Sequence, residues 1–283
     1  MTTQPPKFGE TRLPGAGRSE VRNKLFAGPS IDSLPQSERS GRSDPAASDC
    51  PSVQTKLLSG NSILGHLPRE EFNHLKPYLR PIPLRRGQIV RDVADHIDSL
   101  HLPLSGMICL FAVMANGSTV VLAATGREGF LGVAALLADG TARLRAVVLV
   151  EGDAVALDCN HLQRILPTAP QFAAALRRYC STHLSQVLQI GACHALHTVQ
   201  QRVSLWLLLV RDRNGSDSLP LTHESLSELL GCRRASVTEA LSALENADLI
   251  RGSRGQISIR DRMKLSEQAC ECYAVLRDRA TFV

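Results

Sequence analysis

The sequence predicts an α+β protein with a β-rich module first, one long helix next, and a compact helical segment that a hairpin closes. Three observations support this. Short apolar runs punctuated by glycines fill the region before residue 167, and an apolar stripe with helical spacing covers residues 171–195. Two short amphipathic helices with a glycine between them then lie near the C-terminus.

The composition of the 283 residues excludes several classes of protein. Apolar residues make up 43% of the chain and charged residues 21%, which permits a packed core and argues against complete disorder. The longest apolar run, Met107–Ala115, is far shorter than the roughly 20 residues of a membrane-spanning helix. The chain does not open with a secretory signal pattern. We therefore expect a cytoplasmic protein without a membrane partner.

The cysteines and histidines give no pattern of a catalytic or metal site. The eight cysteines include no Cys-x-x-Cys pair, which excludes zinc-ribbon, ferredoxin and thioredoxin patterns. Scattered thiols of this kind are expected to be reduced and buried, so we predict no metal and no cofactor. The nine histidines show no nucleophile–base spacing, so we predict no catalytic residue and no enzyme. Whether Cys270 and Cys272 are redox-active is left open, although i,i+2 side chains on one helix point apart.

The chain before the long helix divides into two parts. Residues 1–52 are rich in proline, glycine, serine and arginine and have no apolar period, which predicts a disordered tail. Residues 53–166 are expected to fold as the β-rich module. It opens with a helical pattern over Ile63–Leu79 that Pro68 interrupts.

Short strands with regular turn signals predict a small β sandwich or barrel within that module. Asn116-Gly117 between two apolar runs predicts a hairpin with a type I′ turn. The predicted strands are Ile89–Val90, Leu100–Leu104, Met107–Met114, Thr119–Ala124, Leu144–Val150 and Ala154–Leu157.

The segment 167–198 is predicted to form one long helix. Its apolar stripe extends over about 35 Å at 1.5 Å per residue and needs a partner, either the β module or a second copy of itself. Gly191 and Ala192 would allow another helix to approach closely. The predicted dimer-interface residues are Leu176, Tyr179, His183, Val187 and Ile190.

Residues 199–283 are expected to form a further domain. A helix is predicted over Val199–Val210, with an apolar cluster around Trp206. We assign Gln200, Gln201 and Arg202 to the solvated face of this helix. The next helix begins after the N-cap Thr222 and ends at Gly231, and another follows over Arg233–Asn246. Two helices joined by a glycine turn are typical of a helix-turn-helix. The runs Leu249-Ile250 and Gln256–Ile259 add a β-hairpin wing.

The polar face of this domain suggests DNA binding. The formal net charge is only +5, so contacts must come from locally placed arginines and not from bulk charge. Residues 251–264 hold Arg251, Arg254, Arg260, Arg262 and Lys264, and a wing of this charge can sit over phosphates. Arginines at the start of the second helix can reach O6 and N7 of guanine. The alternative is a helical hairpin inside a core, with solvated arginines. The predicted DNA-binding residues are Thr222, Arg233, Arg234, Ser236, Thr238, Glu239, Arg251 and Arg254.

Three stretches, Gly126–Gly132, Leu196–Arg202 and Leu229–Thr238, complete a pattern that resembles the Crp/Fnr superfamily of bacterial transcription regulators over roughly residues 55–283. The resemblance implies an N-terminal cNMP-binding-like β-roll, which is a double-stranded β-helix or jelly roll. It also implies a homodimer joined through residues 171–195 that binds a palindromic operator in double-stranded DNA. The two recognition helices would enter successive major grooves, and RNA polymerase would be a further partner.

The effector pocket departs from the cyclic-AMP-binding members. Val133 stands where those members carry the glutamate that holds the ribose, and Leu144 replaces the serine beside Arg143. A buried ribose hydroxyl without a partner costs about 1–3 kcal/mol. We therefore predict a regulator that cyclic AMP does not control. The alternative is a cyclic-nucleotide-binding regulatory protein whose β-roll senses a nucleotide or other small ligand. The candidate pocket residues are Gly129, Gly132, Val133, Arg143 and Leu144.

Other features of the family are also altered. Cys50 is the sole cysteine of the tail, which argues against an iron–sulfur sensor. The base-reading positions of the family map onto Arg234, Ala235, Thr238 and Glu239, and of these Arg234 alone keeps a guanine-reading residue type. Glu239 either accepts a hydrogen bond from cytosine N4 or lies off the bases.

Overall fold

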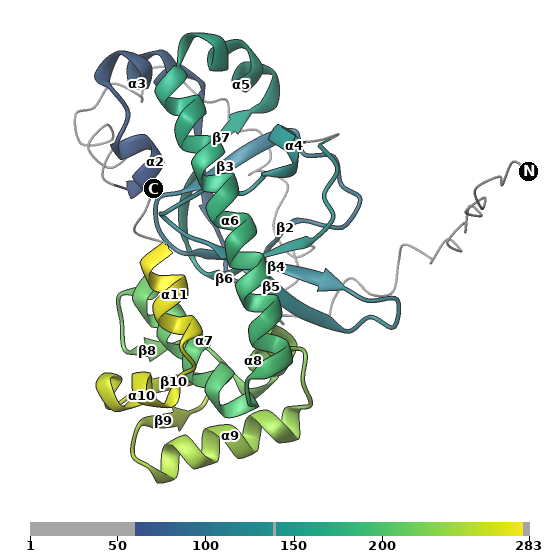
Figure 1. The fold of residues 1–283 in the computed structure, drawn as a ribbon, viewed down its shortest axis with the longest axis vertical. Helices are drawn as coiled ribbons and strands as arrows, with labels where there is room; N and C mark the ends of the chain where they lie inside the picture. The colour runs from purple at the N-terminus through teal and green to yellow at the C-terminus, as the bar shows by residue number, and fades with distance from the viewer. Residues whose placement is uncertain (1–59, 138–139, 280–283) are drawn as a thin grey trace, which may run out of the picture.

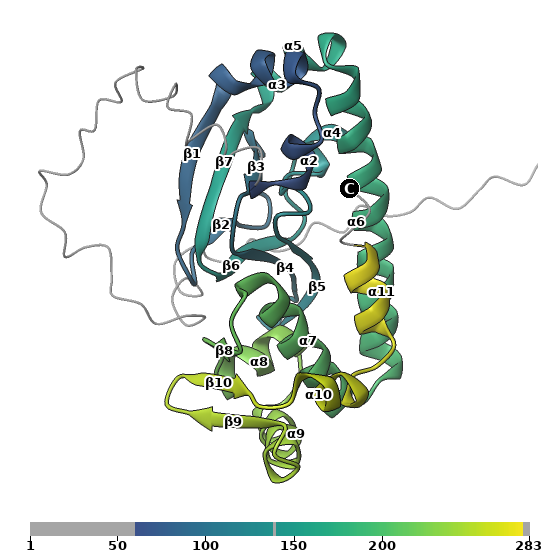
Figure 2. The same ribbon diagram turned by 90° about the vertical axis from the view of Figure 1, so that its left-hand side faces the viewer.

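The computed structural model describes residues 60–137 and 140–279, and the predicted tail lies outside these residues. Two antiparallel sheets face each other in the first half of the described chain, and the long helix α6 (Pro170–Leu196) runs beside them to the C-terminal helices (Figures 1 and 2). Within the described residues, no helix combines the length and apolar character that crossing a bilayer requires. The predicted α+β class is confirmed.

The first elements differ from the predicted helix over Ile63–Leu79. The chain forms α2 (Ser62–Gly65), α3 (Arg69–Leu75) and a short 3-10 turn, η4 (Lys76–Tyr78), and it then becomes the strand β1 (Leu79–Leu84). Pro68 is the N-cap of α3. The sequence prediction missed β1 because two of its six residues are prolines. They are tolerated because β1 pairs with β7 alone and lies at an edge of its sheet.

The β module consists of a three-stranded sheet in the order β1-β7-β3 and a four-stranded sheet in the order β2-β6-β4-β5. Alternate residues of both sheets point into a shared apolar core, which the pleat of the strands requires. The remaining strands are β2 (Ile89–Arg91), β3 (Ser99–Pro103), β4 (Met107–Val113), β5 (Thr119–Thr125), β6 (Arg145–Val150) and β7 (Gly152–Asp158). The core between the sheets contains Leu84, Ile108, Leu110, Ala123, Leu131, Ala146, Val148 and Ala154.

The β4–β5 hairpin is confirmed, but its turn is not type I′. A type I′ turn needs positive φ at both central residues, and here Gly117 has φ +82° whereas Asn116 is not among the residues with positive φ. The Gly117 N–H donates to the Met114 carbonyl at 2.9 Å, and Met114 N–H donates to Ser118 O at 2.9 Å. The loop is therefore a longer one that ends in a glycine bulge. The Asn116 side chain stabilises it by accepting from the Ser118 N–H at 3.0 Å.

Short helices surround α6 at the N-terminal end of its path. The helix α4 (Ala134–Leu137) lies in the loop between β5 and β6, and α5 (Cys159–Ile165) and η5 (Leu166–Thr168) lead into α6. At about 1.5 Å per residue, the 27 residues of α6 extend for about 40 Å. One face of α6 is buried against its own chain along most of this length, through Phe172, Leu176, Tyr179 and Ile190.

The C-terminal part is a helical domain with a small sheet. Thr198 and Gln201 form a capping box that starts α7 (Val199–Asn214), and Gly215 ends that helix in a left-handed conformation. The helix runs one turn beyond the predicted Val210. The other elements are β8 (Ser218–Leu219), α8 (His223–Leu230), α9 (Arg234–Asn246), β9 (Ile250–Ser253), β10 (Gln256–Ile259), α10 (Arg262–Gln268) and α11 (Cys272–Arg279).

Arg202 was predicted on a solvated face, but the structure buries it between the two halves of the protein. Its guanidinium donates to the Leu230 carbonyl at 3.2 Å and to His194 Nδ1 at 3.0 Å. His194 Nε2 in turn donates to the Val121 carbonyl on β5 at 2.8 Å. Burial beside this guanidinium lowers the pKa of His194, which keeps the ring neutral and able to accept. These bonds connect α7, α6, α8 and the β module.

A buried ion pair forms a second connection between the halves. Arg213 on α7 donates to Glu128 Oε1 at 2.8 Å, and the side chains are 10% and 12% exposed. Glu128 also accepts from the Gly126 N–H at 3.1 Å, so the ion pair holds the turn after β5. Removing one partner of such a pair leaves the other as an uncompensated buried charge.

We expect Glu128→Gln to lower the free energy of unfolding by about 3–5 kcal/mol, because Arg213 then keeps its charge in a buried place. Urea denaturation followed by circular dichroism measures this change. The matched control is Lys264→Ala, which removes an exposed ion pair with Asp261 at 3.4 Å and should cost no more than about 1 kcal/mol. Equal small effects for both variants would contradict the structural role of the buried pair.

Candidate functional site

The C-terminal domain places two short helices around a tight turn. The Thr222 hydroxyl accepts from the Ser225 N–H and caps α8, and Gly231 ends α8 at φ +60°. A side chain at Gly231 would be strained by that φ and would lie 2.9 Å from Val120 Cβ on β5. The turn is therefore seated against the β4–β5 hairpin.

Glu228 lies at the same contact. Thr119 of β5 donates to its backbone carbonyl at 3.4 Å, and its carboxylate is half-buried. Burial and the neighbouring carboxylate of Glu224 raise the pKa of Glu228 to about 7. Near neutral pH this end of α8 therefore carries less negative charge than its sequence implies.

The helix α9 has one buried and one exposed face. Val237, Ala240, Leu241 and Leu244 are buried, as the sequence predicts. The predicted outward residues Arg233, Arg234, Thr238 and Glu239 are exposed, and Ser236 is half-buried. Arg233 is the N-cap of α9 and not its first helical residue. In both ribbon views α9 lies at the end of the molecule away from the β module (Figures 1 and 2).

The predicted wing is present and is attached to α9. The strands β9 and β10 pair antiparallel around a turn at Arg254 and Gly255, and β8 extends them to a three-stranded sheet. The Gly252 N–H donates to Glu245 Oε1 at 2.7 Å, so the last turn of α9 holds the first wing strand. Arg251 and Arg254 are exposed on the wing.

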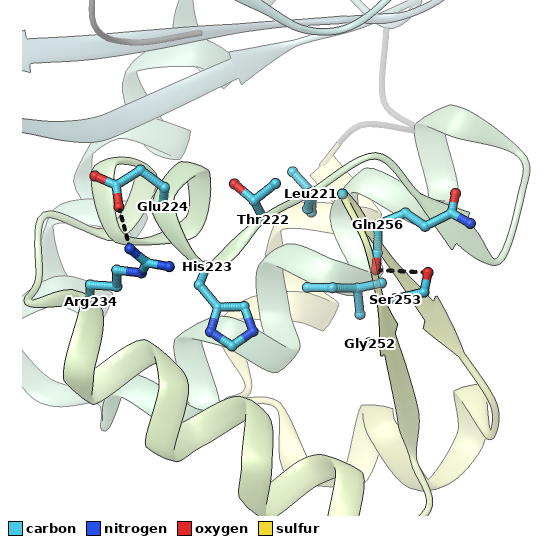
Figure 3. A pocket seen from close by; sticks show the side chains of 10 residues that line it. Leu221, Thr222, His223, Glu224, Arg234, Gly252, Ser253 and Gln256 are labelled. Carbon is cyan, nitrogen blue, oxygen red and sulfur yellow. Dashed lines mark hydrogen bonds and ion pairs between the residues drawn. The ribbon is translucent and has the colours of Figure 1, made fainter. Parts of the chain in front are cut away.

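A hollow of about 250 Å³ lies between the start of α8, Arg234 and the wing (Figure 3). Arg234 Nη1 lies 3.7 Å from Glu224 Oε2, and the two side chains are 69% and 60% exposed. An exposed pair of this kind contributes about 0–1 kcal/mol, so the guanidinium is able to exchange Glu224 for another acceptor. The wall opposite Arg234 is formed by Ser253 and Gln256 of the wing.

His223, which was not among the residues predicted from the sequence, also lines this hollow. Its Nδ1 lies 2.9 Å from the Thr238 hydroxyl, which connects the first turn of α8 to the exposed face of α9. Thr238, assigned to DNA contact from the sequence, therefore already has a partner within the protein. The signal was a histidine directly after the N-cap threonine.

The cationic cluster predicted over residues 251–264 is smaller than its composition suggests. Arg260 lies 4.0 Å from Asp248, Arg262 lies 3.4 Å from Asp212, and Lys264 lies 3.4 Å from Asp261. Their charges are partly neutralised inside the domain. By contrast, Arg233, Arg251 and Arg254 form no ion pair with any residue in the described parts of the chain.

A second hollow, of about 350 Å³, lies in the β module against α6. Four of the predicted effector residues line it, namely Gly132, Val133, Arg143 and Leu144. Gly129 is not among its lining residues, because it packs against Tyr179, where a Cβ would overlap the phenol ring. The sequence did not predict the apolar walls that other elements supply. These walls include Ile97, Leu110, Phe130, Ala146 and Val187.

The basic groups of this pocket are largely committed or neutral. Arg91 donates to Asp98 at 2.9 Å and to the Ser99 carbonyl at 2.8 Å. Arg145 on β6 lies between two lining residues but does not line the pocket itself, and it makes two bonds to the Asp92 carboxylate, at 2.9 and 3.0 Å. Burial lowers the pKa of His183 to about 4, so its ring is neutral at neutral pH. Its buried Nδ1 has no hydrogen-bond partner among the described residues.

The predicted dimer-interface residues are used inside the monomer. Leu176, Tyr179, His183 and Ile190 are buried against their own chain, and Val187 is half-buried at the effector pocket. The apolar stripe therefore marks the face that packs on the β module. The solvent-facing side of α6 carries Leu184 and Leu188, which are 61% and 66% exposed.

Comparisons with known proteins agree with this architecture. A family model described as a cyclic nucleotide-binding domain matches residues 81–168, and one described as a Crp-like helix-turn-helix domain matches residues 201–268. The chain belongs to the Crp/Fnr family. It is thus a Crp-like transcription regulator with a cyclic-nucleotide-binding-type domain and a DNA-binding helix-turn-helix.

Characterised relatives of this Crp/Fnr regulator cover most of it. It is 24% identical over 221 residues to a CRP-like cAMP-activated global transcriptional regulator of Mycobacterium tuberculosis, covering 76% of this chain and 99% of the relative. It is 26% identical over 217 residues to a cyclic AMP receptor protein of Thermus thermophilus, covering 75% and 98%.

Solved structures share the fold of the Crp/Fnr regulator. A Crp/Fnr-family regulator from Eubacterium rectale superposes with a TM-score of 0.59 at 19% identity, covering 73% of this chain and 97% of the other. FixK2 from Bradyrhizobium japonicum gives a TM-score of 0.58 at 17% identity, covering 68% and 98%. The two-sheet module, long helix and winged helix-turn-helix thus form an established arrangement.

Proposed function

We propose that this Crp/Fnr regulator is a homodimer that binds a palindromic operator and that cyclic AMP does not control it. The functional division follows the sequence: a tail over 1–52, an effector module over 53–166, a dimerisation segment over 167–198 and a DNA-binding domain over 199–283. The protein is a cytoplasmic regulator without catalytic activity, and RNA polymerase is its further partner at the promoter.

The exposed start of α9 is the observation that supports sequence-specific binding. Arg233 and Arg234 project from the N-terminal end of the helix, where the backbone N–H groups and the helix dipole also favour phosphate. Arg251 and Arg254 are exposed on the wing, whose residues Ser253 and Gly255 line the same hollow as Arg234. In this proposal Arg234 reads a guanine, and Arg254 contacts phosphate.

The exposed face of α6 supports self-association. Arg177, Ser181, Leu184, Leu188, Gly191 and Ala195 follow one another at alternating spacings of four and three residues, which is the heptad pattern of a two-stranded coiled coil. Each is exposed, and a Cβ at Gly191 would meet no atom within 4 Å. We therefore assign the dimer interface to this face and not to the stripe that the sequence suggested.

We expect Leu184→Asp combined with Leu188→Asp to give folded monomers, because the charges enter the proposed seam without disturbing the monomer core. Sedimentation velocity at micromolar concentration measures the change in mass. The matched control is Met263→Asp, which alters a side chain that is 76% exposed on α10 and should remain dimeric. A double variant that is still dimeric would rule out this face.

Arg234→Ala should weaken operator binding by about 1–3 kcal/mol and relax preference at one base pair per half-site. Arg254→Ala should weaken all sequences alike and lower the salt slope by about one unit. Selection of bound sequences from random duplex DNA, followed by fluorescence anisotropy, measures both effects. The selected site should be an inverted repeat with half-site centres about 10–10.5 base pairs apart.

Arg277→Ala is the control for this pair, because Arg277 lies on α11 and pairs with Asp278 at 3.3 Å. It should leave the selected site and the affinity unchanged. If Arg234→Ala stayed folded and selected the same site with the same affinity, α9 would not be the recognition helix. If both arginine variants lost affinity equally for all DNA sequences, Arg234 would contact the DNA backbone and would not read a base.

The chemistry of the effector pocket supports independence from cyclic AMP. Some relatives are named for cyclic AMP, but here the side chains of Val133 and Leu144 offer no polar atom to a ribose or a phosphate. Arg91 already binds a carboxylate, and Arg143 lies exposed at the pocket. The apolar walls favour a second candidate function, a regulator that senses a small and mainly apolar effector.

Isothermal titration calorimetry with cyclic AMP at millimolar concentration should give no saturable heat, because a ribose hydroxyl and a phosphate would be buried without sufficient partners. Operator affinity should be unchanged by the nucleotide. Binding at micromolar concentration that Arg143→Ala abolishes would instead support the cyclic-nucleotide alternative and overturn this assignment.

A further inference from the structure

Four metal-binding side chains meet where α6 ends. Cys193 lies on the last turns of α6, His197 is the C-cap of that helix, Cys270 precedes α11 and Cys272 is its first residue. The three sulfur atoms and one ring nitrogen all lie within 4.8 Å of one another. In both ribbon views α11 lies beside this part of α6 (Figures 1 and 2).

The spacing of these atoms matches one tetrahedral ion. Bond lengths of about 2.3 Å to sulfur and 2.0–2.1 Å to nitrogen place two sulfurs about 3.8 Å apart, and a sulfur and a nitrogen about 3.6 Å apart. The Cys193 and Cys270 sulfurs are 3.6 Å apart, and Cys272 Sγ lies 3.7 Å from His197 Nδ1. These contacts are close to the edges of such a tetrahedron.

The neighbouring polar groups orient the same four atoms. His197 Nε2 lies 3.2 Å from Glu271 Oε1, so the carboxylate holds the ring with Nδ1 facing the cysteines. Gln189 Nε2 donates to Cys272 Sγ at 3.1 Å. A carboxylate behind a histidine ligand and an amide N–H on a thiolate are the outer partners usually found at metal sites.

The three thiols are buried, whereas His197 is half-buried. Uncompensated thiolates would be costly in an apolar surrounding, and a divalent cation removes that cost.

We propose that Cys193, His197, Cys270 and Cys272 bind one structural zinc ion. Three thiolates and one imidazole in a closed tetrahedral set are a ligand set of structural zinc sites. Zinc is preferred over calcium, magnesium or manganese because those ions select oxygen ligands. No Cys-x-x-Cys pattern marks this site, because its ligands come from a Cys-x-Cys pair and from a segment more than 70 residues away.

The position of the ion gives it a structural role. Cys193 and His197 end α6, and Thr198 immediately begins α7, so the site lies at the junction between the long helix and the DNA-binding domain. Cys270 and Cys272 belong to the C-terminal segment that packs on α6 and α7. Zinc would therefore fasten α11 to this junction and restrict rotation between the two helices.

The first test uses the full chain, purified without a metal-binding tag and dialysed against metal-free buffer. Mass spectrometry of the metal content should give about one zinc per chain. Cobalt substitution should give the intense ligand-field bands of a tetrahedral ion together with a sulfur-to-cobalt charge-transfer band. Removing the ion with a chelator should lower Tm on the order of 10 °C, because a tightly bound ion stabilises the folded state.

Variants identify the ligands. Cys193→Ser, Cys270→Ser and Cys272→Ser should each abolish the charge-transfer band or reduce it strongly, whereas Cys159→Ser, a half-buried cysteine on α5, should leave it unchanged. Glu271→Gln keeps all four ligands and should weaken zinc binding about 10–100-fold. This variant keeps the proposal testable if the cysteine variants do not fold.

Three results of the metal-binding measurements would overturn the proposal. They are a zinc content well below one per chain after loading, an octahedral cobalt spectrum, and zinc binding that is the same in Cys270→Ser and Glu271→Gln as in the unchanged protein. A Cys193–Cys270 disulfide in protein purified under reducing conditions would also overturn it, because the sulfurs would then bind each other and not an ion. The site does not depend on whether α9 binds DNA.

Discussion

The two-sided packing of α6 is the constraint on which the rest of the structure depends. A single helix of 27 residues contacts the β module over its first turns and the C-terminal domain over its last. Its buried face must therefore match two different partners, which explains why large apolar residues, a tyrosine and a histidine occur along it. The opposite face of α6 does not pack against either described part of its own chain, so its residues can follow a heptad pattern.

Polar contacts between the β module and the C-terminal domain fix how these two parts are oriented on α6. The bonds from Arg202 through His194 to Val121, and the Arg213–Glu128 ion pair, each join the C-terminal domain to strand β5 or to the turn after it. Buried pairs are weak evidence of net stability, but they fix orientation because misplacing one leaves unpaired charges. The effector pocket is lined by Phe130 and Leu131, which follow this turn, and by Val187 of α6. A change at the pocket therefore has a short physical route to the helix-turn-helix.

The sequence was sufficient for those features that local rules determine. The strands β3 to β7, the hairpin, the long helix, the capped α8 and the wing were all predicted from periodicity, caps and turn residues. The prediction of β1 failed because edge pairing overrides the usual effect of prolines. The type I′ turn was wrong because loop length, and not the Asn-Gly pair alone, sets the backbone of the turn.

The functional surfaces were harder to predict because they depend on which face a side chain meets. The apolar stripe on α6 does not show whether a β sheet or a second chain covers it. A run of arginines in the sequence likewise does not show which of them form ion pairs with carboxylates of distant segments. His223, Arg202 and the cysteine cluster all acquire their partners from distant segments. Such pairings are a property of the tertiary structure and leave no local pattern in the sequence.

The bond between Glu245 and the Gly252 N–H joins the last turn of α9 to the first wing strand. It restrains the distance from the residues that would enter the major groove to those that would contact the adjacent backbone. A DNA segment whose groove is too narrow or too wide must deform to satisfy both ends, and the energy of that deformation depends on its base steps. Operator choice would then include indirect readout at base pairs that no side chain touches.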